Sequence, residues 1–111
     1  MEDTVTMTKS VGIGEGTIIH RHTAIRGPVV IGDRCEIGPN AYIGPYTSIG
    51  DHATIRNTEI ENTIVMQSAH IDCGRRITDS LIGRNVTILN HENNLPRGHK
   101  LILGDMATVT L

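Results

Sequence analysis

Isoleucine recurs every six residues through the first half of this chain. The repeated residues are Ile13, Ile19, Ile25, Ile31, Ile37, Ile43, Ile49 and Ile55, without interruption. A small or β-branched residue stands four positions after each of the first seven, and glycine directly follows five of the eight. An amphipathic helix needs apolar spacings of three and four, and a half-buried strand alternates throughout. A period of six therefore fits neither a helix nor a simple strand.

A period of six is satisfied when each hexad forms one short strand followed by a corner. Three hexads then close a triangular coil, and successive coils stack as parallel strands about 4.8 Å apart. In this geometry the eight isoleucines point inward and form the structural core, and the second inward position is small because the interior is narrow. We expect the glycine after each isoleucine to form the corner, because glycine adopts left-handed backbone angles at little cost.

The repeat loosens after Ile55 but keeps its register. Steps of five or six residues lead through Ile60, Val65, Ile71, Ile77, Ile82 and Ile88. The series from Ile13 to Ile88 predicts between four and five coils. Residues 11–111 should form this one domain, and residues 1–10 either cap the first coil or are the frayed start of a segment cut from a longer chain.

The sequence changes character near its end. The stretch 90–99 is polar and rich in turn residues, so we expect it to leave the prism as a loop. Leu101, Leu103 and Val109 then suggest a final strand that packs back against the coils.

Composition favours an all-β chain and excludes several functions. Among 111 residues there are 12 Gly and 2 Tyr but no Trp or Phe, so the core cannot depend on aromatic rings. The net charge is −2 and the basic residues are scattered, so we expect no nucleic-acid surface. No apolar run approaches the roughly 18 residues of a membrane span, and no signal peptide is evident, which predicts a soluble cytoplasmic protein. Cys35 and Cys73 should be reduced core residues.

The hexad Ile-Gly-x-x-small-x resembles the hexapeptide repeat of left-handed parallel β-helices. That resemblance implies an all-β, single-stranded left-handed parallel β-helix. The handedness comes from the resemblance alone, because the usual preference for right-handed parallel crossovers would predict the opposite hand.

Five longer strings narrow the resemblance. They are IRGPVVIG at 25–32, IGPYTSIG at 43–50, EIENTIVM at 59–66, DSLIG at 79–83 and LILGD at 101–105. In this order they are similar to the C-terminal β-helix of long-form glucose-1-phosphate thymidylyltransferases, also called dTDP-glucose pyrophosphorylases. The resemblance covers roughly residues 11 to 111.

In that family a separate N-terminal nucleotidyltransferase domain converts dTTP and glucose 1-phosphate to dTDP-glucose and diphosphate. It uses a glycine-rich phosphate loop and acidic ligands for Mg²⁺, and this chain contains no such loop. The resemblance therefore implies no catalytic, cofactor-binding or metal residue here, with Mg²⁺ confined to the parent enzyme's missing catalytic domain. We expect a non-catalytic oligomerisation or regulatory module, partnered by a nucleotidyltransferase domain in the same or another chain.

The six histidines leave an enzyme alternative open, namely a small stand-alone hexapeptide acyltransferase or a γ-carbonic-anhydrase-like protein. A zinc site needs three or four converging ligands; His20 and His22 share one face of a strand, whereas His52 stands apart. We interpret these three as solvated side chains. An acyltransferase would need a general base, for which His91 and His99 are candidates.

A second open possibility concerns anions. Arg75, Arg76 and Arg97 could form an anion site in an oligomer, for example for a regulatory nucleotide.

Apolar residues at outward positions predict self-association. Ile18, Val30 and Ile64 are expected on the flat prism faces, and Tyr42 and Tyr46 at corners where rings contact a neighbouring prism. By analogy with related β-helices we expect a homotrimer.

Overall fold

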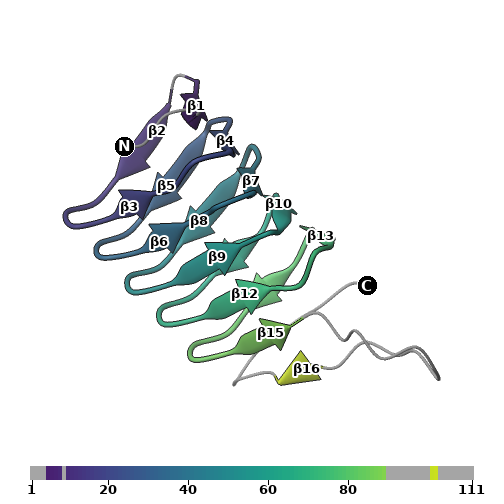
Figure 1. Cartoon of the computed structure of the whole chain (residues 1–111). Coiled ribbons are helices and arrows are strands. Elements are labelled where there is room, and N and C mark those ends of the chain that lie inside the picture. Colours follow the sequence, from purple (N-terminus) through teal and green to yellow (C-terminus); the bar gives the residue numbers. More distant parts are fainter. Residues whose placement is uncertain (1–4, 9, 90–100, 103–111) are drawn as a thin grey trace.

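The computed structural model describes residues 5–8, 10–89 and 101–102 of the chain. Strands β1 to β15 follow one another around three parallel sheets, so that every three strands complete one triangular coil (Figure 1). The described residues therefore form a β-helix of five coils. This confirms the fold that the hexads predicted, at the upper end of the expected number of coils.

Each of the three sheets forms one face of the prism. Sheet A contains β1 (Val5–Met7), β4 (Thr23–Ile25), β7 (Tyr42–Ile43), β10 (Glu59–Glu61) and β13 (Arg76–Thr78). Sheet B contains β2 (Val11–Ile13), β5 (Val29–Ile31), β8 (Thr47–Ile49), β11 (Ile64–Val65) and β14 (Leu81–Ile82). Sheet C contains β3 (Ile18–Ile19), β6 (Glu36–Ile37), β9 (Thr54–Arg56), β12 (His70–Asp72), β15 (Thr87–Leu89) and β16 (Leu101–Ile102).

The inward isoleucines stack from coil to coil and form the core. In sheet C, Ile37 of β6 is in register with Ile19 of β3 and with Ile55 of β9. Seven of the eight predicted core isoleucines are buried. Ile13 differs: it is 38% exposed, because β2 belongs to the first coil and has a described neighbouring strand, β5, on one side only.

The coils shorten toward the C-terminal end without losing this register. In sheet C the inward residues are 18 positions apart from Ile37 to Ile55, 16 from Ile55 to Ile71 and 17 from Ile71 to Ile88. The missing residues come from the corners, since the strands on either side still pair residue by residue. This confirms the prediction that the looser repeat after Ile55 continues the same coils.

The corners bend at a different position from the one expected. Of the five glycines that directly follow a repeat isoleucine, only Gly38 has a positive φ. At six of the eight repeat isoleucines a left-handed residue stands three positions later, and examples are Arg34 at φ 54 and His52 at φ 61. These residues donate their backbone N–H to the carbonyl of an adjacent coil, from Arg34 to Glu15 over 2.8 Å and from His52 to Asp33 over 2.9 Å. That bond offsets the roughly 1–2 kcal/mol that a left-handed side chain costs.

The glycines after isoleucine are required for close approach between coils. A Cβ on Gly32 would collide with the carboxylate of Asp51 and would lie 2.9 Å from the Asp51 backbone nitrogen. The same carboxylate accepts a hydrogen bond of 2.8 Å from the backbone N–H of Asp33. Glycine at this position therefore makes room for a side chain of the next coil that satisfies a corner N–H.

The two ends of the prism carry the least regular strands. At the N-terminal end β1 pairs in parallel with β4, so sheet A begins before residue 11, where the domain was expected to start. Residues 5–7 lack the hexad but carry the alternation of Val5 and Met7, which pack against the core. At the other end β16 pairs with β15, which confirms a final strand that packs back against the coils; its antiparallel orientation was not predicted (Figure 1).

Some predictions fall outside the described residues. These are the polar loop at 90–99 and the contributions of Leu103 and Val109. In the part of the chain that the structure describes, no helix has the length and apolar character of a membrane span.

Candidate functional site

The outward residue of each strand forms a ladder along each face of the prism. On sheet A the ladder is Thr6, Ala24, Tyr42, Glu59 and Arg76. On sheet B it is Gly12, Val30, Ser48, Ile64 and Leu81. On sheet C it is Ile18, Glu36, Thr54, His70 and Thr87. Sheets A and C thus present charged groups to solvent, whereas the ladder of sheet B carries none.

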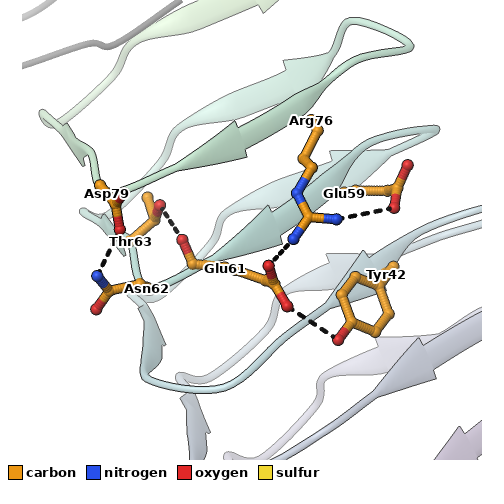
Figure 2. A network of polar contacts seen from close by, with 7 residues as sticks. All are labelled: Tyr42, Glu59, Glu61, Asn62, Thr63, Arg76 and Asp79. Atoms are coloured by element: carbon orange, nitrogen blue, oxygen red, sulfur yellow. Dashed lines mark hydrogen bonds and ion pairs between the residues drawn. The ribbon is translucent and has the colours of Figure 1, made fainter.

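Sheet A holds a network of polar side chains (Figure 2). The Arg76 guanidinium donates to the Glu61 carboxylate and lies 3.8 Å from Glu59 Oε1. The Tyr42 hydroxyl donates to the other oxygen of Glu61 over 3.2 Å. Glu61 is the least exposed of the ionic partners, at 26%, against 52% for Arg76. Exposed ion pairs of this kind contribute about 0–1 kcal/mol, so the network mainly fixes the orientation of these side chains.

The sequence analysis missed this network. Tyr42 was expected at a corner, but it lies within β7 on the face of sheet A. Its hydrogen-bond partner Glu61 is 19 residues away, and Arg76 is 15 residues from Glu61, so each contact spans about one coil. The signal that could have found them is the register of the shortened coils, which places Glu59 beside Tyr42 and Arg76 beside Glu59. Tyr46 does lie at a corner, with φ 63 and 71% exposure.

The structure separates the histidines that the zinc alternative considered. His20 Nε2 lies 3.2 Å from Glu36 Oε1 on sheet C, and His22 follows at the corner between sheets C and A. His52 occupies the different corner between sheets B and C. Among the described residues no group of three metal-ligating side chains comes together. His91 and His99, the candidates for an acyltransferase base, lie outside the described residues.

The arginines of the possible anion site do not share one environment. Arg76 is bound by the carboxylates on sheet A, as described above. Arg75 lines a shallow depression of about 110 Å³ at the corner between sheets C and A, beside Asn40, Asn57 and Glu59. Arg97 lies outside the described residues. The depression is open to solvent and has a carboxylate on its rim, which does not favour an anion there.

Cys35 and Cys73 are free and buried, as predicted. Cys35 occupies the small inward position after Ile31, and its thiol donates to the Gly50 carbonyl over 3.1 Å. Desolvation by burial raises the pKa of the Cys35 thiol, which favours its protonated form. Both cysteines are packing residues of the buried core.

Comparison with known proteins gives the context of this fold. The chain is 39% identical over 110 residues to a glucose-1-phosphate thymidylyltransferase of Streptomyces antibioticus, covering 99% of this chain and 30% of that protein. It is 38% identical over 85 residues to the Streptomyces griseus enzyme of the same name, covering 77% of this chain and 23% of that protein. The chain thus spans less than a third of the length of these relatives.

The fold is also found in an acyltransferase. A mutant perosamine N-acetyltransferase of Caulobacter crescentus, solved with CoA and GDP-perosamine, superposes with a TM-score of 0.62 at 17% identity. The superposition covers 95% of this chain and 56% of that one. At this identity the likeness establishes the β-helix fold alone.

A match to a protein-family model shows the family of this chain. The model described as the GMPPB C-terminal domain matches residues 25–110, which is most of the five-coil prism. The chain therefore belongs to the GMPPB C-terminal domain family and is homologous to the C-terminal part of glucose-1-phosphate thymidylyltransferases.

Proposed function

We propose that this β-helix is a non-catalytic module that assembles and regulates a sugar-1-phosphate nucleotidyltransferase. The observation that carries the proposal is the match of 99% of this chain to only 30% of a glucose-1-phosphate thymidylyltransferase. In this proposal the nucleotide chemistry belongs to the remaining 70% of such an enzyme, and the part that corresponds to this chain takes no part in it.

The side chains of the described faces support an assembly role. Arg76, Glu61 and Tyr42 bond one another on sheet A, and His20 lies against Glu36 on sheet C. These polar groups are held by partners within the described part of the prism. A rigid prism with partnered polar side chains suits a scaffold that positions larger domains.

The parent reaction would be dTTP plus glucose 1-phosphate to dTDP-glucose plus diphosphate. The nucleotidyltransferase domain, in the same chain or a partner chain, would bind both substrates and the Mg²⁺ that neutralises the phosphates. We place this work in the cytoplasm, where sugar nucleotides are made. The module would contribute by fixing how many such domains come together.

We propose a closed ring of three copies as the assembled form. Closed cyclic symmetry satisfies every copy's contact surface and avoids open-ended fibres. Exposed apolar side chains such as Val30, at 61%, and Ile64, at 53%, supply a surface that association would cover.

The proposal is tested on the polypeptide in its native cell extract, captured with an antibody to this domain. Peptides of a nucleotidyltransferase domain, on the same polypeptide or on a stoichiometric partner, would support the proposal. A 12.1 kDa species with no such domain would overturn it. A parallel assay offers the purified 111-residue chain dTTP, glucose 1-phosphate and Mg²⁺, and measurable diphosphate release would refute the non-catalytic assignment.

The same purified chain distinguishes the enzyme alternative. Stoichiometric bound zinc, or saturable binding of coenzyme A, would favour a carbonic-anhydrase-like protein or an acyltransferase over a scaffold. We expect neither.

A further inference from the structure

Sheet B differs from the other two faces in its charge. Its five described strands contain only Val, Gly, Ile, Thr, Ser and Leu. The strands of sheet A include Glu59, Glu61 and Arg76, and those of sheet C include Glu36 and Asp72 among other charged residues. The strands of this one face therefore carry no charged side chain over the whole described height.

The same face gathers most of the exposed apolar surface. Of seven large apolar side chains that are exposed in the described residues, five lie on or beside sheet B, and one of these, Ile13 of β2, is an inward residue of the first coil. Val30 and Ile64 are on its outward ladder, Tyr46 borders it at the corner with sheet A, and Met66 follows directly after β11. Aromatic residues and methionine are enriched in the buried centres of protein interfaces, and charged residues are depleted there.

Symmetry makes the lack of charge informative. When identical prisms surround an axis parallel to their own, the outward ladder of the inner face lies nearest the axis, and each residue of that ladder meets its own copies at the same height. Sheet A turned inward would bring copies of Glu59 together, and sheet C would do so with Glu36. Like charges in close contact cost several kcal/mol. Sheet B would bring together Gly12, Val30, Ser48, Ile64 and Leu81, none of which repels its copies.

We propose that sheet B is the surface through which copies of this chain associate, with sheets A and C facing outward. This inference rests on the proposed assembly function and adds the face and the contacting residues. Along the axis, each residue of the sheet B ladder should form one layer with its own copies, in the order Val30, Ser48, Ile64 and Leu81. Sheets A and C, with their polar networks, stay available to solvent or to the attached domains.

The size of the face sets the expected strength of association. Five coils at about 4.8 Å, across a face roughly 20 Å wide, give on the order of 500 Å² per copy. Two such faces reach about 1,000 Å² in total, the lower limit for a specific interface, and three reach about 1,500 Å². Association of the isolated chain should therefore be reversible and concentration-dependent, and one buried charge should abolish it.

The test compares two arginine substitutions in the same coil. Ile64→Arg places a charge on the outward ladder of sheet B, in β11, and His70→Arg places one at an exposed outward position of sheet C. In sedimentation equilibrium over a hundredfold range of concentration, the average mass should rise toward three times the 12.1 kDa chain mass for the wild-type chain and for His70→Arg. Ile64→Arg should sediment as a single chain. Circular dichroism checks that both variants keep the cooperative unfolding of the wild type.

The possible outcomes separate the inference from the function on which it rests. If the wild type associates but only His70→Arg dissociates it, sheet B is the wrong face and the assembly function stands. If the wild type is monomeric at every concentration, both fail. A wild-type dimer that Ile64→Arg dissociates keeps sheet B as the interface and refutes the ring of three.

A cross-link gives a second measurement that needs no disruption of the assembly. Ser48→Cys lies on the outward ladder of sheet B, whereas Thr54→Cys lies on that of sheet C, and the two natural cysteines are buried. Mild oxidation should join two chains covalently in Ser48→Cys and should leave Thr54→Cys single on a non-reducing gel. The reverse pattern would overturn the proposed face.

Discussion

The inward register of the isoleucines can be tested with two substitutions of the same kind on the same sheet. Ile37→Ala removes part of a side chain that is fully buried between Ile19 and Ile55. Ile18→Ala makes the same change on the outer face of sheet C, where the side chain is 50% exposed. The two variants lose identical atoms. A difference between their free energies of unfolding therefore shows which side chain points into the prism and which points outward.

The magnitudes follow from the burial of each side chain. Ile37→Ala loses about 2.4 kcal/mol of transfer free energy, from three carbon groups at about 0.8 kcal/mol each, plus a term for the cavity. Because coils interact only with their neighbours, the cavity weakens the contacts of the second coil with both the first and the third. We expect a total loss of about 3–4 kcal/mol for Ile37→Ala. Ile18→Ala should lose about 1 kcal/mol or less, because half of its surface already contacts water.

The free energy of unfolding is measured by urea titration followed by circular dichroism, with the midpoint and the slope fitted separately. The titration uses a protein concentration low enough to keep all variants in one association state. Equal destabilisation by the two substitutions would refute the inward register. Ile37→Asp extends the series: a carboxylate inside the prism should abolish cooperative unfolding altogether.

Three further outcomes follow from contacts described above. Gly32→Ala should destabilise the chain by about 1–3 kcal/mol in the same urea titration, because its Cβ collides with the next coil, whereas Gly12→Ala, with open space around it, should change little. Glu61→Gln should cost less than about 1 kcal/mol, and a larger loss would show that the exposed network stabilises the sheet more than we infer. Cys35 should react with a thiol reagent only in urea, because its side chain is buried in the folded chain. Since burial raises the pKa of the folded-state Cys35 thiol, the free energy of unfolding should be unaffected by this group at neutral pH and should fall as the pH rises above the ordinary thiol pKa.

The interior of the prism could be predicted because it repeats. Each inward position meets the same narrow space, so Ile37 and Ile55 are selected for the same size and shape in every coil. The corners could not be predicted in the same way. Arg34 and Tyr46 adopt left-handed angles, because the hydrogen bond to an adjacent coil offsets the cost for residue types that have no preference for that conformation.

The outer surface could be predicted only in part. Once the inward residues are known, the sequence shows that the apolar residues Val30 and Ile64 occupy outward positions. The contact of Tyr42 with Glu61 is not, because it depends on how many residues each shortened corner loses. A register error of one position would move every outward residue to the inside, so contacts between coils require the coordinates.

The shortened coils show that the number of residues per coil is not what defines this architecture. Coils of 18, 17 and 16 residues carry the same inward ladder, since the backbone bonds between strands hold each coil to its neighbours independently of corner length. A deletion at a corner is therefore a local event that leaves distant coils in phase. Such a chain can diverge by trimming or enlarging its corners one at a time, which changes its outer surface while its interior stays the same.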